Sequence, residues 1–250
     1  MGVAVSRVYI HELIDVIGHN RARYMQHMTA NWGPIGRAER GQRCFGVWAT
    51  VGSTGRWPQV VNLWEYESWE ALGNNFEVEL TGSGLQDPSL ESWWAEAAAF
   101  RSGGLDRIMV APDWSPSVDE HCAGPGLPAV GYLHETITTG PGGAGPLLES
   151  FRAAGRDAMA AHGLGLVAAL ATAMANDHEV IMIWSIPDWG TWAAFESSHA
   201  DPGSAIRAFR NSVPQTPRGW SRNLMADAPL SPLRTGRQPQ VEDRRPVDDR

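Results

Sequence analysis

The sequence predicts an α+β fold in which two similar units follow each other along the chain and pack their sheets face to face. Three pairs of matching segments support this prediction. They are YIHE at 9–12 with YLHE at 132–135, VVNLWEYESWEAL at 60–72 with VIMIWSIPDWGTW at 180–192, and IMVAPDWSP at 108–116 with LMADAPLSP at 224–232. The matches keep their order with a slowly drifting spacing, which is typical of an internal repeat.

The first unit follows from hydrophobic periodicity, from β-branched and aromatic runs, and from turn and cap residues. Its predicted elements are a strand at 8–14, a helix at 20–32, strands at 44–51 and 60–66 around a glycine-containing hairpin loop, helices after Ser68 and after Asp87-Pro88, and a strand at 107–112. Serine and aspartate are placed where side chains cap helix N-termini.

The second unit repeats this plan. Its predicted elements are a strand at 131–137, a helix that starts near Pro146, strands at 165–172 and 180–186, a helix capped by Asp188, and a strand at 223–229. Both units read β-α-β-β-α-β, which is the ferredoxin-like pattern, with one extra helix expected before the last strand.

The domain boundaries follow from composition. The units are expected at 1–116 and 129–229, and the Pro/Gly-rich segment 117–128 is expected to link them. Residues 230–250 contain few apolar side chains, so a disordered tail is expected there.

Composition limits the kinds of molecule that the chain is expected to bind. The chain has 250 residues and a formal net charge of -8, without a basic cluster that would favour nucleic acid or a membrane surface. No secretion signal and no apolar run long enough to cross a membrane is visible, so a cytoplasmic protein with reduced Cys44 and Cys122 is expected. All basic residues are arginine, and the absence of lysine excludes a lysine Schiff base and therefore the usual covalent attachment of pyridoxal phosphate.

Side-chain alternation predicts which residues face the space between the sheets. In the first strands, Val8, Ile10 and Ile14 are expected to meet the helices, and the predicted opposite face carries Tyr9, His11, Tyr132 and His134. In the third strands, Val61, Leu63, Ile181 and Ile183 are expected under the helices, and the predicted inner set is Asn62, Trp64, Tyr66, Met182 and Trp184. Glu12 and Glu135 interrupt the apolar face, and a register slip of one residue would bring both into the pocket.

The stretch GVWATVGSTGRWPQVVNLWEYES at 46–68 resembles the NIPSNAP family of the dimeric α/β-barrel superfamily. The resemblance covers residues 6–116, and 129–230 more weakly; His11 and the absence of lysine depart from the family pattern. It implies that two tandem ferredoxin-like units pack their sheets into one α/β barrel around a pocket. The superfamily contains cofactor-free oxygenases, isomerases and lyases, haem enzymes, and members without known activity, so the fold alone does not select a reaction.

His11 and His134 are the candidate catalytic residues. Imidazole titrates near neutral pH, so the pair could act as general acid and base on a molecule held between the sheets. The candidate substrate-binding residues are Tyr9, Asn62, Trp64, Tyr66, Tyr132, Met182 and Trp184.

We therefore expect a lyase, isomerase or monooxygenase that acts on a small hydrophobic or aromatic metabolite without a cofactor, in bacterial catabolism or biosynthesis. Three alternatives stay open. The histidines could form a structural hydrogen-bonded unit, they could serve a haem- or transition-metal-dependent enzyme, or the chain could be a non-catalytic binding protein. A homodimer is compatible with the resemblance.

Overall fold

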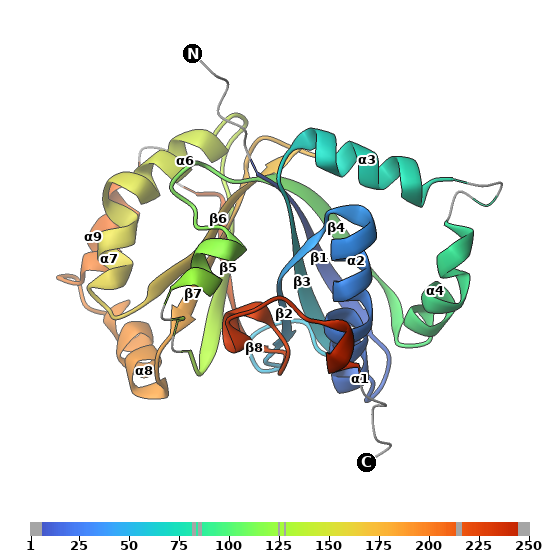
Figure 1. The fold of residues 1–250 in the computed structure, drawn as a ribbon. Coiled ribbons are helices and arrows are strands. Elements are labelled where there is room, and N and C mark those ends of the chain that lie inside the picture. The colour runs from blue at the N-terminus through green and yellow to red at the C-terminus, as the bar shows by residue number, and fades with distance from the viewer. Residues whose placement is uncertain are drawn as a thin grey trace.

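The computed structural model describes residues 7–81, 84, 87–124, 126–127, 129–213 and 217–244. Its strands form one closed barrel in the order β1-β3-β2-β8-β5-β7-β6-β4. Figure 1 shows the barrel between two flanking groups of helices, one for each half of the chain. Among the described residues, no helix is both long and apolar enough to span a membrane.

The first half of the barrel comprises four strands and the helices that cover them. Its elements are β1 (Val8–Val16), α1 (Arg21–Gln26), the π-helical segment η1 (His27–Trp32), α2 (Gly33–Arg40), β2 (Arg43–Thr50), β3 (Gln59–Tyr66), α3 (Trp69–Glu79), the 3-10 segment η2 (Pro88–Leu90), α4 (Glu91–Ala98) and β4 (Arg101–Val110).

The second half has the same order of elements after a short connecting helix. Its elements are α5 (Val118–Ala123), β5 (Gly131–Thr138), α6 (Ala144–Ser150), the π-helical segment η3 (Phe151–Gly155), α7 (Arg156–Ala160), β6 (Gly165–Ala173), β7 (Glu179–Ile186), α8 (Trp189–Ser198), α9 (Ala205–Ser212), β8 (Gly219–Asp227), α10 (Pro232–Thr235) and the 3-10 segment η4 (Val241–Asp243).

Strand pairing is the same in both halves. In the first, β3 and β4 flank β1 and β2 adds to β3; in the second, β7 and β8 flank β5 and β6 adds to β7, all antiparallel. The β2–β8 and β4–β6 pairs join the halves and close the barrel. The predicted fold class, with an extra helix before each last strand, is therefore confirmed.

The helix caps agree with the sequence prediction. The Ser68 hydroxyl accepts from the backbone N–H of Ala71, and the Asp188 carboxylate accepts from that of Thr191. These side chains satisfy backbone donors that the first helical turn leaves unpaired.

The core has three layers, because each sheet buries both of its faces. One layer fills the barrel interior, and its members include Tyr9, Phe45, Trp48, Tyr132, Ile181 and Met225. The other two layers lie between the sheets and the helices of the first and second halves. A barrel of this size is narrow enough for side chains to fill it.

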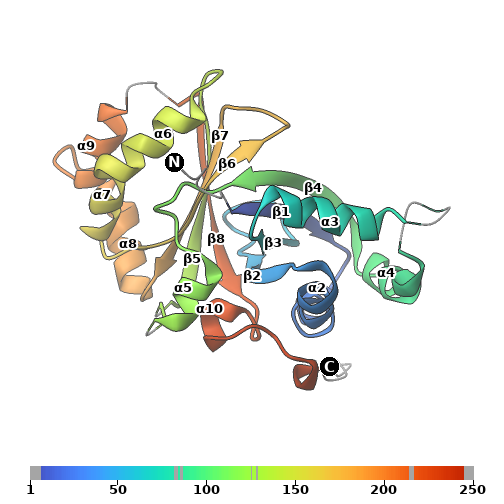
Figure 2. The same cartoon turned by 45° about the horizontal axis from the view of Figure 1, so that its top comes forward.

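Residues 230–244 are folded, which corrects the prediction of disorder for this part of the tail. Leu233 of α10 is buried, and the Gln238 amide exchanges hydrogen bonds with the backbone N–H and C=O of Cys44. Figure 2 shows α10 beside α5, at the end of the barrel near β2. These contacts use backbone groups of β2 that composition does not reveal. Residues 245–250 lie outside the described part of the chain.

Candidate functional site in the first half of the barrel

His11 and His134 meet in the middle of the barrel. Their Nε2 atoms are 2.9 Å apart, so one imidazole donates a hydrogen bond and the other accepts it. Burial, the partner ring and Arg107 hold the pKa of His11 well below its ordinary value. Burial and Arg107 lower the pKa of His134 to about 4. Both rings are therefore neutral near pH 7.

The sequence correctly predicted that the histidines face each other, but not what surrounds them. Their side chains are 0% and 2% exposed, and tightly packed aromatic and aliphatic residues fill the barrel around them. The predicted pocket between the sheets is wrong for this reason. Tyr9 and Tyr132 do face the interior, where Tyr9 donates to Glu65 over 2.8 Å and Tyr132 lies 3.5 Å from Asp227.

The predicted faces of β3 and β7 are reversed. Directly opposite residues in an antiparallel pair share a face, and His11 lies opposite Leu63 while Ile10 lies opposite Trp64. Leu63 therefore points into the barrel with His11, and Trp64 points toward the helices. The same register moves the other members of the predicted inner set to the helix side, namely Asn62, Tyr66, Met182 and Trp184.

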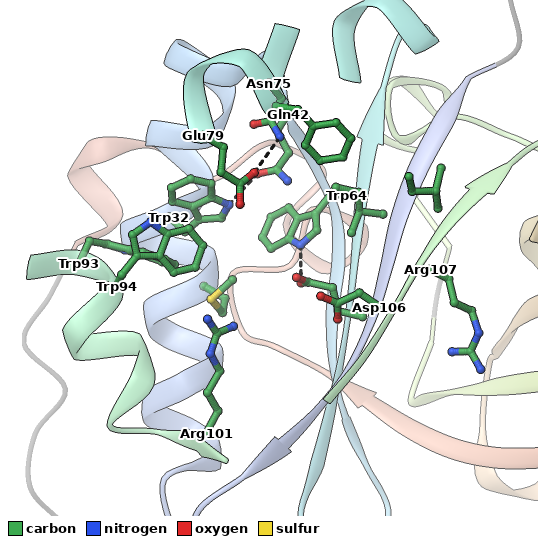
Figure 3. A pocket seen from close by; sticks show the side chains of 15 residues that line it. Trp32, Gln42, Trp64, Asn75, Glu79, Trp93, Trp94, Arg101, Asp106 and Arg107 are labelled. Carbon is green, nitrogen blue, oxygen red and sulfur yellow. Dashed lines mark hydrogen bonds between the residues drawn. The ribbon is translucent and has the colours of Figure 1, made fainter. Parts of the chain in front are cut away.

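A cavity of about 230 Å³ lies on that outer face, between the first-half sheet and its helices (Figure 3). Four tryptophans, Trp32, Trp64, Trp93 and Trp94, form much of its wall, and the polar side chains around it include Gln42, Asn75, Glu79, Glu12, Arg101 and Asp106. Met28 and Trp32 come from η1, and π-helical turns occur often at functional sites.

Glu12 is held asymmetrically at the cavity. Its Oε2 atom accepts from the Trp64 indole over 2.7 Å and from the Asn62 amide over 2.8 Å. Asn62 also contacts the Tyr24 hydroxyl at 2.8 Å. No described residue donates a hydrogen bond to Oε1 of Glu12. One oxygen therefore fixes the carboxyl group, and the other is free to bind a ligand.

Burial and the nearby charge of Asp106 raise the pKa of Glu12 to about 7. Hydrogen bonds from Trp64 and Asn62 and the charge of Arg101 act in the opposite direction. Asp106 lies directly opposite Glu12 on β4, and its own pKa is raised by burial. A carboxyl group that titrates near pH 7 in a tryptophan-lined cavity has the properties of a general base.

The corresponding carboxylate of the second half is sealed. Glu135 accepts one indole N–H on each oxygen, from Trp184 and from Trp220, both over 2.8 Å. Phe151 and Phe209 pack against Trp220 on the helix side. A groove passes over Trp220, but Glu135 is 2% exposed and does not line it. Both oxygens of Glu135 are therefore occupied by indole donors, whereas Glu12 can be reached from the cavity.

Gly103 and Gly104 lie on β4 directly opposite Asp15 and Ile14 of β1. Gly103 has a φ of 145°, and a Cβ atom at Gly104 would lie 2.4 Å from the carbonyl oxygen of Leu13. The β1–β4 register shifts between Asp15 and Val16, and such bulges are common beside active sites. The sequence pointed to Glu12 only as an interruption of an apolar face, and it did not single out Arg101, Asp106 or Trp94 as site residues.

Structural comparisons show the fold. A putative monooxygenase from Fusobacterium nucleatum subsp. nucleatum aligns with a TM-score of 0.57 and 9% identity, over 90% of this chain and 94% of that one. A putative monooxygenase from Lactobacillus acidophilus aligns with a TM-score of 0.57 and 7% identity, over 89% and 94%. The chlorite dismutase of Candidatus Nitrospira defluvii in complex with imidazole aligns with a TM-score of 0.50 and 8% identity, over 91% of this chain and 93% of that one.

At these identities the likeness concerns the fold alone, a closed barrel of strands flanked by helices. No protein-family model matches the chain, and no curated protein matches its sequence. A NIPSNAP-like domain protein from Burkholderia xenovorans aligns over 44% of this chain with a TM-score of 0.35, so the NIPSNAP resemblance stays a prediction. Within the described ranges, no three His, Cys, Asp or Glu side chains are grouped to hold a metal ion.

Proposed function

We propose that the chain is an enzyme that transfers a proton to or from a small hydrophobic or aromatic molecule, with Glu12 as the general base. The observation that carries this proposal is the free Oε1 atom of Glu12 in the tryptophan-lined cavity. It replaces the histidine hypothesis, because His11 and His134 are sealed inside the barrel.

The geometry suits this role. Trp64 and Asn62 hold Oε2, so the carboxyl group keeps one orientation and its other oxygen faces the ligand. A base works best when its pKa lies near the working pH, and that of Glu12 is raised to about 7.

The size of the cavity supports a small ligand. An engineered apolar cavity of roughly 150 Å³ binds benzene, and this cavity measures about 230 Å³. One or two aromatic rings therefore fit among the indoles.

Removal of a proton is a step that isomerases, lyases and cofactor-free oxygenases have in common. The two fold neighbours described as putative monooxygenases make oxygenation one reaction to test here. The proposal itself is limited to the proton transfer, because that is the step for which the cavity supplies a group.

The test is solvent exchange. The chain is incubated in D₂O with a panel of one- and two-ring aryl ketones, and deuterium uptake at the carbon beside the carbonyl is followed by NMR. We expect Glu12→Gln to lower the enzyme-dependent rate at least about 100-fold, as for loss of a general base. Glu77→Gln on the exposed face of α3 is the matched control. Equal rates in Glu12→Gln and the wild type, or no exchange with any ketone, would overturn the proposal.

A further inference from the structure

Arg101 brings a positive charge to the cavity from the first residue of β4. Figure 3 shows its side chain rising toward the tryptophans, and its Cζ atom lies 5.6 Å from the centre of the Trp94 ring. The guanidinium also lies near the Tyr24 hydroxyl and near Glu12 and Asp106, and its charge lowers the pKa of both carboxyl groups.

Within the described ranges, the guanidinium of Arg101 takes part in no ion pair. The neighbouring arginines differ in this respect. Arg40 pairs with Asp87 over 2.7 Å, and Arg107 points away from the cavity and pairs with Glu179 over 2.6 Å (Figure 3). A partly buried guanidinium that no carboxylate holds in a close ion pair is a ready recognition group for an anion.

The indoles beside Arg101 supply flat apolar walls. Trp93 lies 4.6 Å from Trp32 and 4.6 Å from Trp94 between ring centres, with the second pair edge to face. Aromatic ligands gain from such stacked and edge-to-face contacts beyond the area that they bury. The indole rings and the guanidinium of Arg101 are adjacent, so one ligand can contact both.

We infer that the cavity takes a one- or two-ring aromatic compound that carries an anionic oxygen, with the ring against the indoles and the oxygen against Arg101. This inference rests on the proposed function, because it concerns the same cavity. Glu12 does not oppose such a ligand with a full negative charge, since burial keeps part of its population protonated near pH 7. Arg101 also lies near Asp106, whose pKa its charge lowers, so the guanidinium offsets part of that negative charge.

The test compares 2-naphthoate with its neutral isostere 2-naphthamide by isothermal titration calorimetry. The wild type should bind the carboxylate at least about tenfold more tightly, which is the effect of one charge-assisted contact. Arg101→Gln should remove this preference and leave the affinity for the amide unchanged. Arg101→Lys should keep most of the preference, and Arg37→Gln on the exposed face of α2 should keep all of it. A second pair, 4-nitrophenolate and 4-nitroanisole, shows whether a phenolate can replace the carboxylate.

Trp94→Ala locates the ligand, because loss of its ring should weaken binding of both naphthalene compounds. The inference is overturned if the wild type binds 2-naphthoate no more tightly than the amide, or binds neither at millimolar concentration. It is also overturned if Arg101→Gln keeps the preference or if Trp94→Ala leaves both affinities unchanged. Failure of the proposed function is distinct: 2-naphthoate would then bind as expected, while Glu12→Gln and the wild type would exchange protons equally.

Discussion

Gly104 and Trp220 occupy corresponding positions in the two halves of the barrel. Gly104 lies directly opposite Ile14 on β1, and Trp220 lies directly opposite Ile137 on β5. The Trp220 indole donates a hydrogen bond to Glu135, whereas glycine has no side chain to donate. This difference accounts for the hydrogen bond that Glu135 accepts on its second oxygen and that Glu12 lacks.

Trp220→Ala should destabilise the protein and expose Glu135. The change removes a ring that packs on Phe151, Phe209 and Arg210 and leaves one oxygen of Glu135 without a donor. We expect a loss of about 3 kcal/mol in the free energy of unfolding, measured in urea. Trp69→Ala, at a half-exposed tryptophan of α3, should cause a smaller loss. Equal losses in the two variants would contradict the sealing role of Trp220.

Stability should fall in acid because of the histidine pair. In the unfolded chain each imidazole takes up a proton near its ordinary pKa of 6.5, whereas in the folded chain the pKa of His134 is about 4 and that of His11 is also lowered. Between these values the unfolded state binds more protons, so the contribution to stability is present above pH 6.5 and is lost as the pH falls toward 4.

The His11→Met/His134→Met double variant isolates this effect, because it removes both titrating rings and keeps the volume apolar. Urea unfolding at pH 7, 6, 5 and 4 should show a shallower decline for this variant than for the wild type. Its solvent-exchange activity should also persist, since the rings do not reach the cavity. An equally steep decline in both proteins would show that other groups govern the acid transition.

Glu12 should lower stability at alkaline pH. Its pKa rises from an ordinary 4.5 to about 7 on folding, so ionisation of the buried carboxyl disfavours the folded state as the pH rises from 4.5 to 7. We expect Glu12→Gln to be at least about 1 kcal/mol more stable than the wild type at pH 8, and this advantage to shrink at pH 4.5. Glu77→Gln serves as the matched control. An advantage for Glu12→Gln that is equal at both pH values would contradict the raised pKa.

Asp106→Asn should shift the pH profile of proton transfer toward acid. The Asp106 charge helps to raise the pKa of Glu12, while Arg101, Trp64 and Asn62 lower it. Removing the negative charge therefore moves the midpoint of the rate below about 7, without loss of the maximal rate. Asp113→Asn, at an exposed site, should leave the midpoint in place. A midpoint unchanged by Asp106→Asn would exclude coupling between the two carboxyl groups.

The sequence predicted the two halves of the barrel and which face of β1 points into it, because the relevant signals are local. The YIHE and YLHE repeats mark the first strands, and alternation places His11 on the face opposite Ile10. For β3 the same method failed, because all its residues are buried and both faces are rich in apolar side chains. Alternation carries no direction in a strand that is buried on both faces, and only the pairing of His11 with Leu63 decides it.

The cavity could not be predicted from the sequence because it depends on residues far apart in the chain. Arg101 and Asp106 come from β4, Trp94 from α4, and Trp32 from the π-helical segment η1. The local sequence of η1 does not predict the extra residue in its helical turn. The difference between Gly104 and its counterpart in the second half becomes visible only when the strand registers are known.

The most direct test of Glu12 as the base is a titration of its carboxyl carbon by ¹³C NMR, with Glu12→Gln used to assign the signal. The midpoint is expected at about 7, since burial and Asp106 both disfavour the ionised form. A midpoint near the ordinary value of 4.5 would contradict the proposal, because Glu12 would then be a solvated surface carboxylate and not a base held in an apolar cavity.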